Sequence, residues 1–382
     1  MRALITGQIG MNKKPYLESV AHLAGQRGRR LEVFHVGDRM YAEDPDVRPG
    51  RILDLSLSRL KALRRAVFKD IIAGTTPAQD HPDIIVNTHA TFRWRHGLFG
   101  ALDFDQVRML APDMFICLVD NIEIVHHRLH AEHDVDATLK DCMVWREEEI
   151  LATELLAQAM DGETRFYILS RGRTQDTIET CLRLITQPRM PKVYPSFPMS
   201  HVMDLPEVQA EIDRFRAVLA RHFITFDPGD VDEKLLLERA IDAAKEGLDW
   251  VEVEDRGPGR PPIRASVREV LDIAGDIDGQ IYMRDFKLID QSDMICSLVP
   301  ELPGGLPGLS SGVERELQHA FEHTKEVYVV WKPRKAPSPF ITETATKIFS
   351  NVEEALRHFE ARGMCREMTV HDGARSSRAG EQ

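Results

Sequence analysis

The stretch PELPGGLPGLSSGVERELQHA, residues 300–320, contains two glutamates that could act on a ligand. The apolar run MICSLV before it predicts a buried strand, the Gly/Pro-rich part predicts a loop, and a helix is expected from Ser311. Ser311 and Glu314 have the spacing of a capping box, which gives Glu314 a structural role. Glu316 then lies one turn into the helix, behind the carboxyl end of a strand, where open α/β sheets bind ligands. A carboxylate there can attack an electrophilic carbon.

A second candidate site lies near the N-terminus, where RALIT (residues 2–6) predicts a strand and GQIGMNKK (residues 7–14) follows it. Strand, glycine-containing turn, lysine and helix are the order of a phosphate-binding loop. The full pattern, G-x-x-x-x-G-K-[S/T], has Asn12 in place of its second glycine and Lys14 in place of its hydroxyl residue. By pattern alone, a tight turn without a ligand is an equal alternative. The candidate nucleotide-binding residues here are Gly7, Gly10, Asn12, Lys13 and Lys14.

The composition limits the classes of function. A formal net charge of −12 argues against a nucleic-acid partner, because no basic stripe offsets it. Five widely separated cysteines indicate reduced thiols and a cytoplasmic protein, and argue against a disulfide framework or a zinc site. We expect neither a signal peptide nor a membrane partner, because no apolar run approaches the ~20 residues of a membrane span.

Strands and helices alternate along both halves of the 382-residue chain. This order predicts an α/β fold with two doubly wound, three-layer domains, each built on a parallel sheet. A proline-bearing linker at 186–191 separates domain 1–188 from domain 189–363. We expect an exposed insertion at about 229–265 and a disordered tail at 364–382. The predicted strands are 2–6, 31–36, 83–87, 114–119, 165–169, 192–197, 222–226, 294–299 and 326–331.

Four histidines fall in one predicted helix, after the fourth strand. His126 and His130 are four residues apart and share a helical face, which is a spacing that can bind a metal. No cysteine or carboxylate beyond Glu132 completes a ligand set, so we predict no metal site in this helix.

Several segments of the first 188 residues occur in a familiar order: ITGQIGMNKK, VFHVGDRM, IIVNTHAT, LAPDMFICLVDNIEIVHHRL and WREEEILATELLAQAM. In these segments the chain resembles the archaeal-type adenylate kinases, a family of P-loop nucleoside monophosphate kinases. The resemblance implies a site for ATP or another nucleotide, and it adds Arg128 of the lid segment to the nucleotide-binding candidates.

The family's Mg²⁺ positions are altered in this sequence. Phosphoryl transfer relies on Mg²⁺ held by the loop hydroxyl and by an acidic residue after the third strand. The corresponding residues here are Lys14 and Asn87. We therefore expect a domain that binds a nucleotide without a Mg²⁺ site and phosphorylates poorly or not at all. Lys14 is a candidate to stand in for the missing cation.

The segments VYPSFPMSH, YMRDFKLIDQSDMI and SSGVERELQHAFEHTKEVYVV, within residues 191–360, resemble the nucleoside 2-deoxyribosyltransferase-like superfamily. The resemblance implies a flavodoxin- or Rossmann-like fold and a homo-oligomer. It also implies Glu316 as the nucleophile and Asp285 as the acidic residue that contacts the base. Gln318 and His319 replace the family's glycine and aromatic residue, which leaves the choice of substrate open. The implied substrate-binding residues are Tyr194, Ser196, Phe197 and Gly312.

These observations predict a nucleotide-handling protein that cleaves or transfers the N-glycosidic bond of a small nucleoside or nucleotide. Glu316 would attack the anomeric carbon while Asp285 helps the base to leave, and water or a second base would then resolve the intermediate. Two alternatives stay open. One is an ATP-dependent nucleoside monophosphate kinase with an accessory C-terminal domain, and the other is a non-catalytic nucleotide sensor.

Overall fold

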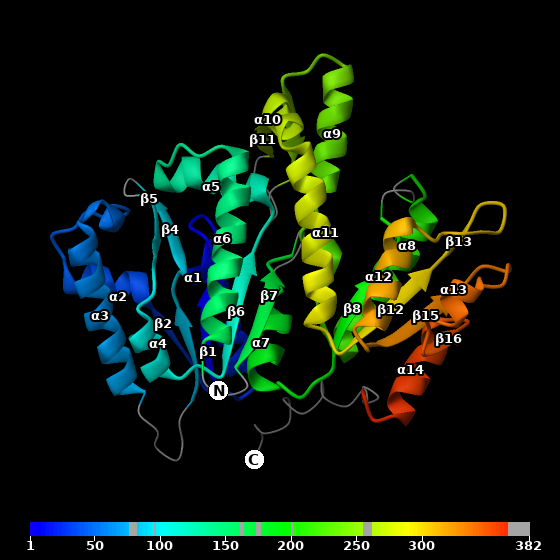
Figure 1. Ribbon diagram of the computed structural model, residues 1–382, viewed down its shortest axis with the longest axis horizontal. Coiled ribbons are helices and arrows are strands. Elements are labelled where there is room, and N and C mark those ends of the chain that lie inside the picture. The colour runs from blue at the N-terminus through cyan, green and yellow to red at the C-terminus, as the bar shows by residue number, and fades with distance from the viewer. Residues whose placement is uncertain are drawn as a thin grey trace, which may run out of the picture. The chain divides into compact units, whose positions relative to one another are not determined.

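A computed structural model gives the fold as two compact units (Figure 1). The first unit combines Met1–Arg189 with Phe226–Gln291, and the second combines Met190–Thr225 with the chain from Ser292 onward. Residues 226–291, which follow the predicted domain boundary, thus pack with the first unit. The structure describes residues 1–75, 82–94, 97–160, 164–172, 177–199, 202, 204–254 and 262–365. The predicted tail from residue 366 and most of the charged loop in the predicted insertion lie outside these ranges.

A parallel five-stranded sheet forms the centre of the first unit, in the order β2-β3-β1-β6-β7. Ile5 at the end of β1 pairs with Asn87 at the end of β3, so the segments after these two strands begin side by side. This edge of the sheet brings the loop after β1 next to Thr88 and His89. The strands are β1 (Arg2–Thr6), β2 (Leu31–His35), β3 (Asp83–Asn87), β6 (Met114–Val119) and β7 (Arg165–Ser170).

Helices enclose this sheet. Side chains alternate along a strand, so Leu4 faces one layer of helices and Ile5 faces the other. Leu4 belongs to an apolar core that α3, α4 and α6 share. Helices α1 and α7 pack against each other, and α1 also packs against β2. The helices of this part are α1 (Lys13–Gln26), α2 (Val36–Glu43), α3 (Leu57–Gly74), α4 (Phe104–Leu110), α5 (Ile122–His133), α6 (Leu139–Gln158) and α7 (Ile178–Thr186), with a 3-10 turn η1 (Ile52–Asp54).

In the first unit, the sequence did not predict helix α2 or two antiparallel hairpins. One hairpin joins β4 (Thr91–Trp94) to β5 (Gly97–Gly100), and the other joins β10 (Trp250–Val253) to β11 (Ile263–Ser266). Each of these strands has only four residues, too few to show a clear alternation of apolar and polar side chains.

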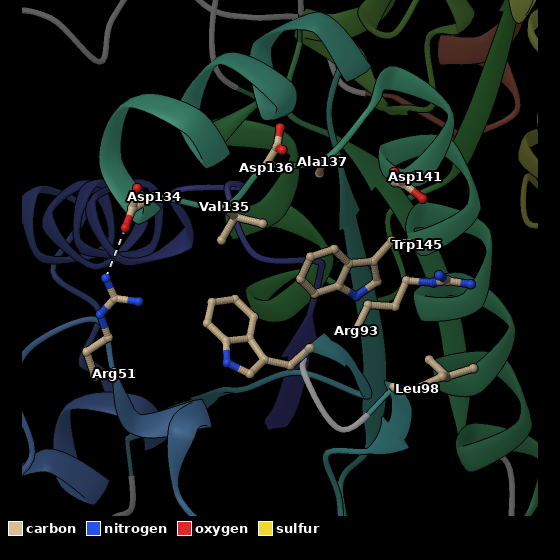
Figure 2. Close-up of a pocket in the computed structure, with 11 residues that line it drawn as sticks. Arg51, Arg93, Leu98, Asp134, Val135, Asp136, Ala137, Asp141 and Trp145 are labelled. Atoms are coloured by element: carbon tan, nitrogen blue, oxygen red, sulfur yellow. Dashed lines mark hydrogen bonds and ion pairs between the residues drawn. The ribbon is translucent and has the colours of Figure 1, made fainter.

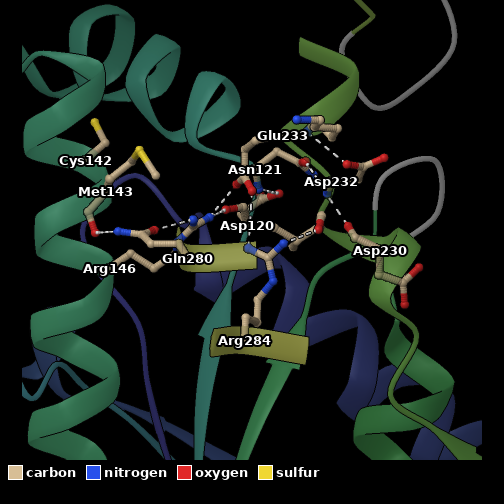
Figure 3. Close-up of polar contacts among 12 residues, drawn as sticks. Asp120, Asn121, Cys142, Met143, Arg146, Asp230, Asp232, Glu233, Gln280 and Arg284 are labelled. Carbon is tan, nitrogen blue, oxygen red and sulfur yellow. Dashed lines mark hydrogen bonds and ion pairs between the residues drawn. The ribbon is translucent and has the colours of Figure 1, made fainter. Parts of the chain in front are cut away.

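Residues 226–291 attach to the first unit through a buried ionic network (Figure 3). Glu233, which is fully buried, accepts from Arg146 Nη1 at 2.5 Å and from Arg284 Nη1 at 3.2 Å. Burial alone would raise the pKa of Glu233, but the two arginines lower it to about 2. Arg146 Nη2 also donates to Gln280 Oε1 at 2.7 Å. The helical elements of this segment are η3 (Pro228–Asp230), α9 (Lys234–Lys245), α10 (Val267–Asp272) and α11 (Ala274–Asp290).

A second parallel five-stranded sheet, in the order β16-β15-β12-β8-β9, forms the centre of the second unit. One face packs with α8 and α14 in a common apolar core, and α12 packs against β12 and β15. The predicted α/β fold with two parallel sheets is therefore confirmed. The elements are β8 (Lys192–Ser196), α8 (Pro206–His222), β9 (Ile224–Thr225), β12 (Met294–Val299), β13 (Glu301–Leu302), β14 (Leu306–Pro307), α12 (Ser311–Glu322), β15 (Glu326–Trp331), α13 (Pro339–Thr342), β16 (Lys347–Phe349) and α14 (Val352–Ala361).

The cysteines and the helices were compared with the predictions from composition. All five cysteines fall within the described ranges, where they are buried and form no disulfide. In the same ranges, no helix combines the length and the apolar character that crossing a bilayer requires.

Candidate functional site

The loop between β1 and α1 has the backbone of an anion-binding turn. Gly7 and Gly10 have φ angles of 141° and 84°, and Asn12 lies in the left-handed region at φ 51°. Asparagine enters this region more readily than most residues, so Asn12 can supply the turn that glycine supplies in the full pattern. A Cβ atom on Gly7 would lie 2.8 Å from the carbonyl oxygen of Leu118, which excludes a larger residue there.

Backbone N–H groups of this loop are available to a ligand. The N–H of Gly7 donates to Glu149 Oε1 at 2.9 Å, and the same buried carboxylate accepts from the backbone of Ala90 and Thr91. Glu149 thereby holds the loop against the segment that follows β3. Unpaired N–H groups at the start of a helix attract anions, phosphate above all. Among the described residues, the N–H groups of Gln8, Ile9, Gly10 and Asn12 have no acceptor.

Lys13 is folded onto the loop. Its Nζ donates to the carbonyl oxygen of Gly7 at 2.5 Å and lies 3.1 Å from Nδ1 of His89. Burial lowers the pKa of Lys13 to about 8, although the carboxylate of Glu149 acts in the opposite direction. Burial and the positive charge of Lys13 hold the pKa of His89 well below its usual range, so the imidazole is neutral at physiological pH.

Two buried arginines contact the same loop. Arg128 Nη1 donates to the carbonyl oxygen of Gly10 at 3.3 Å and to Asp120 Oδ2 at 3.2 Å. Arg171 Nη1 donates to the carbonyl oxygen of Met11 at 2.7 Å. The structure thus places Arg128 beside the loop. The sequence did not single out Arg171, and the only feature that could have done so is its position directly after β7.

Lys14 and Asn87 stand where the adenylate kinases hold Mg²⁺, and both side chains contact other residues in this structure. Lys14 Nζ forms an ion pair with Asp38 Oδ2 at 2.6 Å, and both side chains are about half exposed. Asn87 Nδ2 lies 2.9 Å from Nδ1 of His35, whose pKa burial lowers. Mg²⁺ prefers hydroxyl, carboxylate and water oxygens in octahedral geometry. The ammonium group of Lys14 cannot coordinate a cation, and the neutral amide of Asn87 is a weaker ligand than the carboxylate it replaces, so no step of the chemistry below passes through Mg²⁺.

A cavity of about 310 Å³ lies beside the loop and includes Ile9, His89 and Asn87 in its wall. Two buried polar atoms of its lining residues, Arg64 Nη2 and Asn87 Oδ1, have no hydrogen-bond partner among the described residues. Arg64 donates through Nη1 to the carbonyl oxygen of Gly100 at 3.2 Å, and its guanidinium lies over the ring of Phe92. Burial lowers the pKa of Arg64 to about 10, so the side chain keeps its charge at neutral pH. A buried guanidinium with an unused donor points to an anionic ligand.

A second pocket of the first unit adjoins this cavity, and the two share Trp94. An ion pair between Arg51 and Asp134, with a distance of 3.0 Å, lies along one side of it, and the indole of Trp145 lies on the opposite side (Figure 2). Trp145 Nε1 is buried and finds no hydrogen-bond partner in the part of the chain that the structure describes. The walls therefore combine aromatic rings with charged side chains, as in a site for a planar polar group.

In the second unit, Glu316 accepts hydrogen bonds from two hydroxyls. Tyr194 donates to Oε1 at 2.8 Å and Ser196 donates to Oε2 at 2.6 Å. Both hydroxyls come from β8, where a spacing of two residues turns their side chains to the same face of the sheet. Helix α12 presents Glu316 to them. The structure thus brings together three of the residues that the sequence selected for this site.

The other predicted residues of this site have different surroundings. Phe197 belongs to the apolar core of the second unit, and Gly312 is exposed in the first turn of α12. Asp285 belongs to the first unit and Glu316 to the second. Asp285 is only 9% exposed, and burial raises its pKa to about 7 although the adjacent Arg284 opposes the shift.

The predicted capping box is wrong by one residue. Ser310, rather than Ser311, is the N-cap of α12, and its side chain accepts from the N–H of Val313. Position N3 is therefore Val313, which has no side-chain acceptor to return to the cap, so Glu314 has no capping role. Glu314 is instead an exposed helix residue, and only Glu316 of the two glutamates contacts Tyr194 and Ser196.

Comparison with known proteins finds an adenylate kinase that is similar to the N-terminal half of the chain. No profile of a protein family matches the chain. The chain is 27% identical to the adenylate kinase of Pyrococcus furiosus over 189 residues, which cover 48% of this chain and 92% of that enzyme. Two solved structures have weaker similarity. A shikimate kinase of Bacteroides thetaiotaomicron gives a TM-score of 0.34 at 10% identity, covering 50% of this chain and 98% of its own. A gluconokinase of Sinorhizobium meliloti gives 0.27 at 14% identity, covering 44% and 81%. The N-terminal half therefore resembles adenylate kinase.

Proposed function

We propose that the first unit is a nucleoside monophosphate kinase domain. ATP would bind with its phosphates at loop 7–14, and a nucleoside monophosphate would bind in the adjoining cavity. The observation that carries this proposal is the juxtaposition of a loop holding Lys13 with a cavity holding Arg64, since His89 both contacts Lys13 and lines the cavity. The similarity to adenylate kinase over most of that enzyme's length supports the same assignment. We therefore propose kinase activity ahead of the cleavage or transfer of an N-glycosidic bond.

The reaction would move the terminal phosphoryl group of ATP onto a phosphate oxygen of the acceptor, giving ADP and a nucleoside diphosphate. Catalysis of this transfer consists mainly of positioning and of neutralising negative charge. Lys13, Arg128 and Arg171 would supply positive charge at the donor phosphates. Arg64 would orient the phosphate of the acceptor through its unused donor, and Trp145 with Trp94 would offer ring surfaces for its base.

Incubation of the full chain with ATP and each nucleoside monophosphate, followed by chromatography of the products, tests this function. We expect a nucleoside diphosphate from at least one acceptor, and its loss in Lys13→Met. Lys61→Met is the matched control, because Lys61 is exposed on α3. ATP binding without any transfer would favour a nucleotide sensor and contradict the kinase.

A second candidate function concerns the second unit, where both carboxylate oxygens of Glu316 accept from hydroxyls. Such contacts fix the orientation of a carboxylate, as attack on an anomeric carbon requires. The carboxylate would form a bond to that carbon as the bond to the base breaks, and water would then release the sugar. Whether Asp285 protonates the leaving base stays a prediction.

Free base released from nucleosides and deoxynucleotides is the measure of this second function. Glu316→Gln should abolish the release, while Glu314→Gln, at an exposed position in the first turn of α12, should leave it unchanged. Release that persists in Glu316→Gln would contradict a nucleophilic role.

A further inference from the structure

We propose that His126, His130 and the backbone carbonyl oxygen of Ala137 form a binding site for a divalent transition-metal ion of the Zn²⁺ type. Both histidines belong to α5, and Ala137 lies in the segment that joins α5 to α6. The inference goes beyond the proposed kinase function and does not depend on it. The side chains of this helix do not complete a ligand set, and the structure supplies the third donor from the backbone.

The three donor atoms lie at distances typical of ligands that share one metal ion. Nε2 of His126 lies 3.2 Å from Nε2 of His130, and the latter atom lies 3.1 Å from the carbonyl oxygen of Ala137. The same carbonyl oxygen also interacts with the imidazole of His126. In a tetrahedral zinc site with bonds of about 2.0–2.1 Å, neighbouring ligand atoms are separated by about 3.3 Å. An ion placed over this triangle can therefore contact all three atoms and keep its remaining positions for water.

Hydrogen bonding accounts for this triangle only in part. A neutral imidazole carries one N–H, so a single proton on Nε2 of His130 would have to serve both the carbonyl oxygen of Ala137 and Nε2 of His126. If both Nε2 atoms carry protons, the two N–H groups face the same oxygen and cannot donate to each other. A metal ion accepts a lone pair from each of the three atoms at once, with both imidazoles protonated at Nδ1.

The local fold holds the donors in place. Histidines four residues apart project from the same face of a helix, a spacing that binds zinc in metalloproteases. Helix α5 ends at Asp134, in the left-handed region at φ 53°, and the N–H of Val135 donates back into the last turn at 3.0 Å. Thr138 then caps α6 in a capping box with Asp141. Ala137 is therefore held between two capped helix ends, with its carbonyl oxygen toward α5.

The donor set selects the class of ion. Imidazole nitrogens suit Zn²⁺, Cu²⁺, Ni²⁺ and Co²⁺, whereas Mg²⁺ and Ca²⁺ prefer oxygen ligands. Asp136, an exposed residue of the same segment, acts electrostatically on His126 and favours positive charge there. Ala137 also lines the pocket that contains Trp145 (Figure 2). A bound ion would thus fix one wall of that pocket.

Calorimetric titration of the full chain with Zn²⁺ at neutral pH tests the site. We expect His130→Ala to weaken Zn²⁺ binding by at least about tenfold, because one of the two imidazole ligands is lost. His130 is exposed, so the variant should melt at the wild-type temperature. His127→Ala is the matched control, since His127 is the exposed neighbour of His126 on α5, and it should keep the wild-type affinity. An unchanged affinity in His130→Ala, an equal loss in His127→Ala, or no binding of Zn²⁺ by the wild type would overturn the inference.

Modification of histidines by diethyl pyrocarbonate, read by tandem mass spectrometry, locates the ion in the wild-type chain. The reagent attacks the lone pair of an imidazole, which a bound metal ion occupies. We expect Zn²⁺ to slow the modification of His130 and to leave that of His127 unchanged. Modification of His130 at the same rate with and without Zn²⁺ would overturn the inference, even where the chain binds Zn²⁺ at another place.

Discussion

The ammonium nitrogen of Lys13 lies 3.1 Å from Nδ1 of His89. Burial and Lys13 itself hold the pKa of His89 well below its usual range, so the imidazole accepts a hydrogen bond rather than repelling Lys13. Lys13 is thus shared between two neutral acceptors, His89 and the carbonyl oxygen of Gly7. A phosphate oxygen is a stronger acceptor than either because it is charged. We infer that nucleotide binding moves the ammonium group from these partners to the phosphate.

The affinity for ATP should depend on pH through Lys13. Its pKa is about 8 in the protein without nucleotide, and a bound phosphate favours the charged form and raises that pKa. Affinity should therefore be complete below pH 8 and fall as the pH rises above it, with uptake of a proton on binding. Calorimetry in buffers of different ionisation enthalpy measures this uptake. Equal affinity at pH 7 and pH 10 would contradict the role of Lys13.

Arg64→Ala should weaken binding of the acceptor monophosphate. The loss of a charge-assisted hydrogen bond costs about 1.5–3 kcal/mol, which corresponds to an increase in KM of roughly 10–150-fold. Arg65 is the matched control, because it is the next residue of α3 and pairs with Asp103 at the surface. An unchanged KM in Arg64→Ala, or an equal effect in Arg65→Ala, would exclude the cavity as the acceptor site.

Glu233→Gln should destabilise the first unit strongly. The substitution leaves Arg146 and Arg284 buried without their shared carboxylate, and breaking such a buried pair costs about 3–5 kcal/mol. Asp278→Asn removes a more exposed pair with Lys234 and should cost at most about 1 kcal/mol. Chemical denaturation of the two variants measures the difference. Similar losses in both would contradict the claim that the network fastens residues 226–291 to the first unit.

Asp285→Asn should change the pH dependence of stability. The pKa of Asp285 is raised to about 7 in the folded chain, so the folded state binds more protons than the unfolded state between about pH 4 and pH 7. The native Asp285 therefore costs little stability at pH 5 and progressively more as the pH rises to 8. Asn should therefore stabilise the protein more at pH 8 than at pH 5, by a difference of roughly 2–3 kcal/mol. A gain that is the same at both values would contradict the shift.

Local patterns in the sequence predicted every strand of the first sheet and every strand of the second except β16. The clearest are β6 and β12, which are buried along their whole length and appear as continuous apolar runs. Resemblance to known families selected Tyr194, Ser196 and Glu316, which the structure brings into contact. The predicted N-cap of α12 was wrong by one residue because residues 310 and 311 are both serines. Either hydroxyl could accept a hydrogen bond from the first turn of the helix, and the sequence alone does not distinguish them.

The remaining features depend on contacts between residues far apart in the chain. Glu233 follows the predicted domain boundary but contacts Arg146 of α6. The two residues are 87 positions apart, and no local sequence pattern indicates such a partner. Arg171 reaches the loop of residues 7–12 in the same way, because β7 is the neighbour of β6 in the sheet and β6 is the neighbour of β1. Strand order, which the sequence did not specify, decides the contact of Arg171 with this loop.

The nucleoside diphosphate formed from ATP and a nucleoside monophosphate tests the central claim most directly. We predict that the full chain forms it, and that Lys13→Met does not although it melts at the wild-type temperature. Formation at the same rate in Lys13→Met would contradict the account, as would ATP binding by the full chain with no diphosphate from any acceptor.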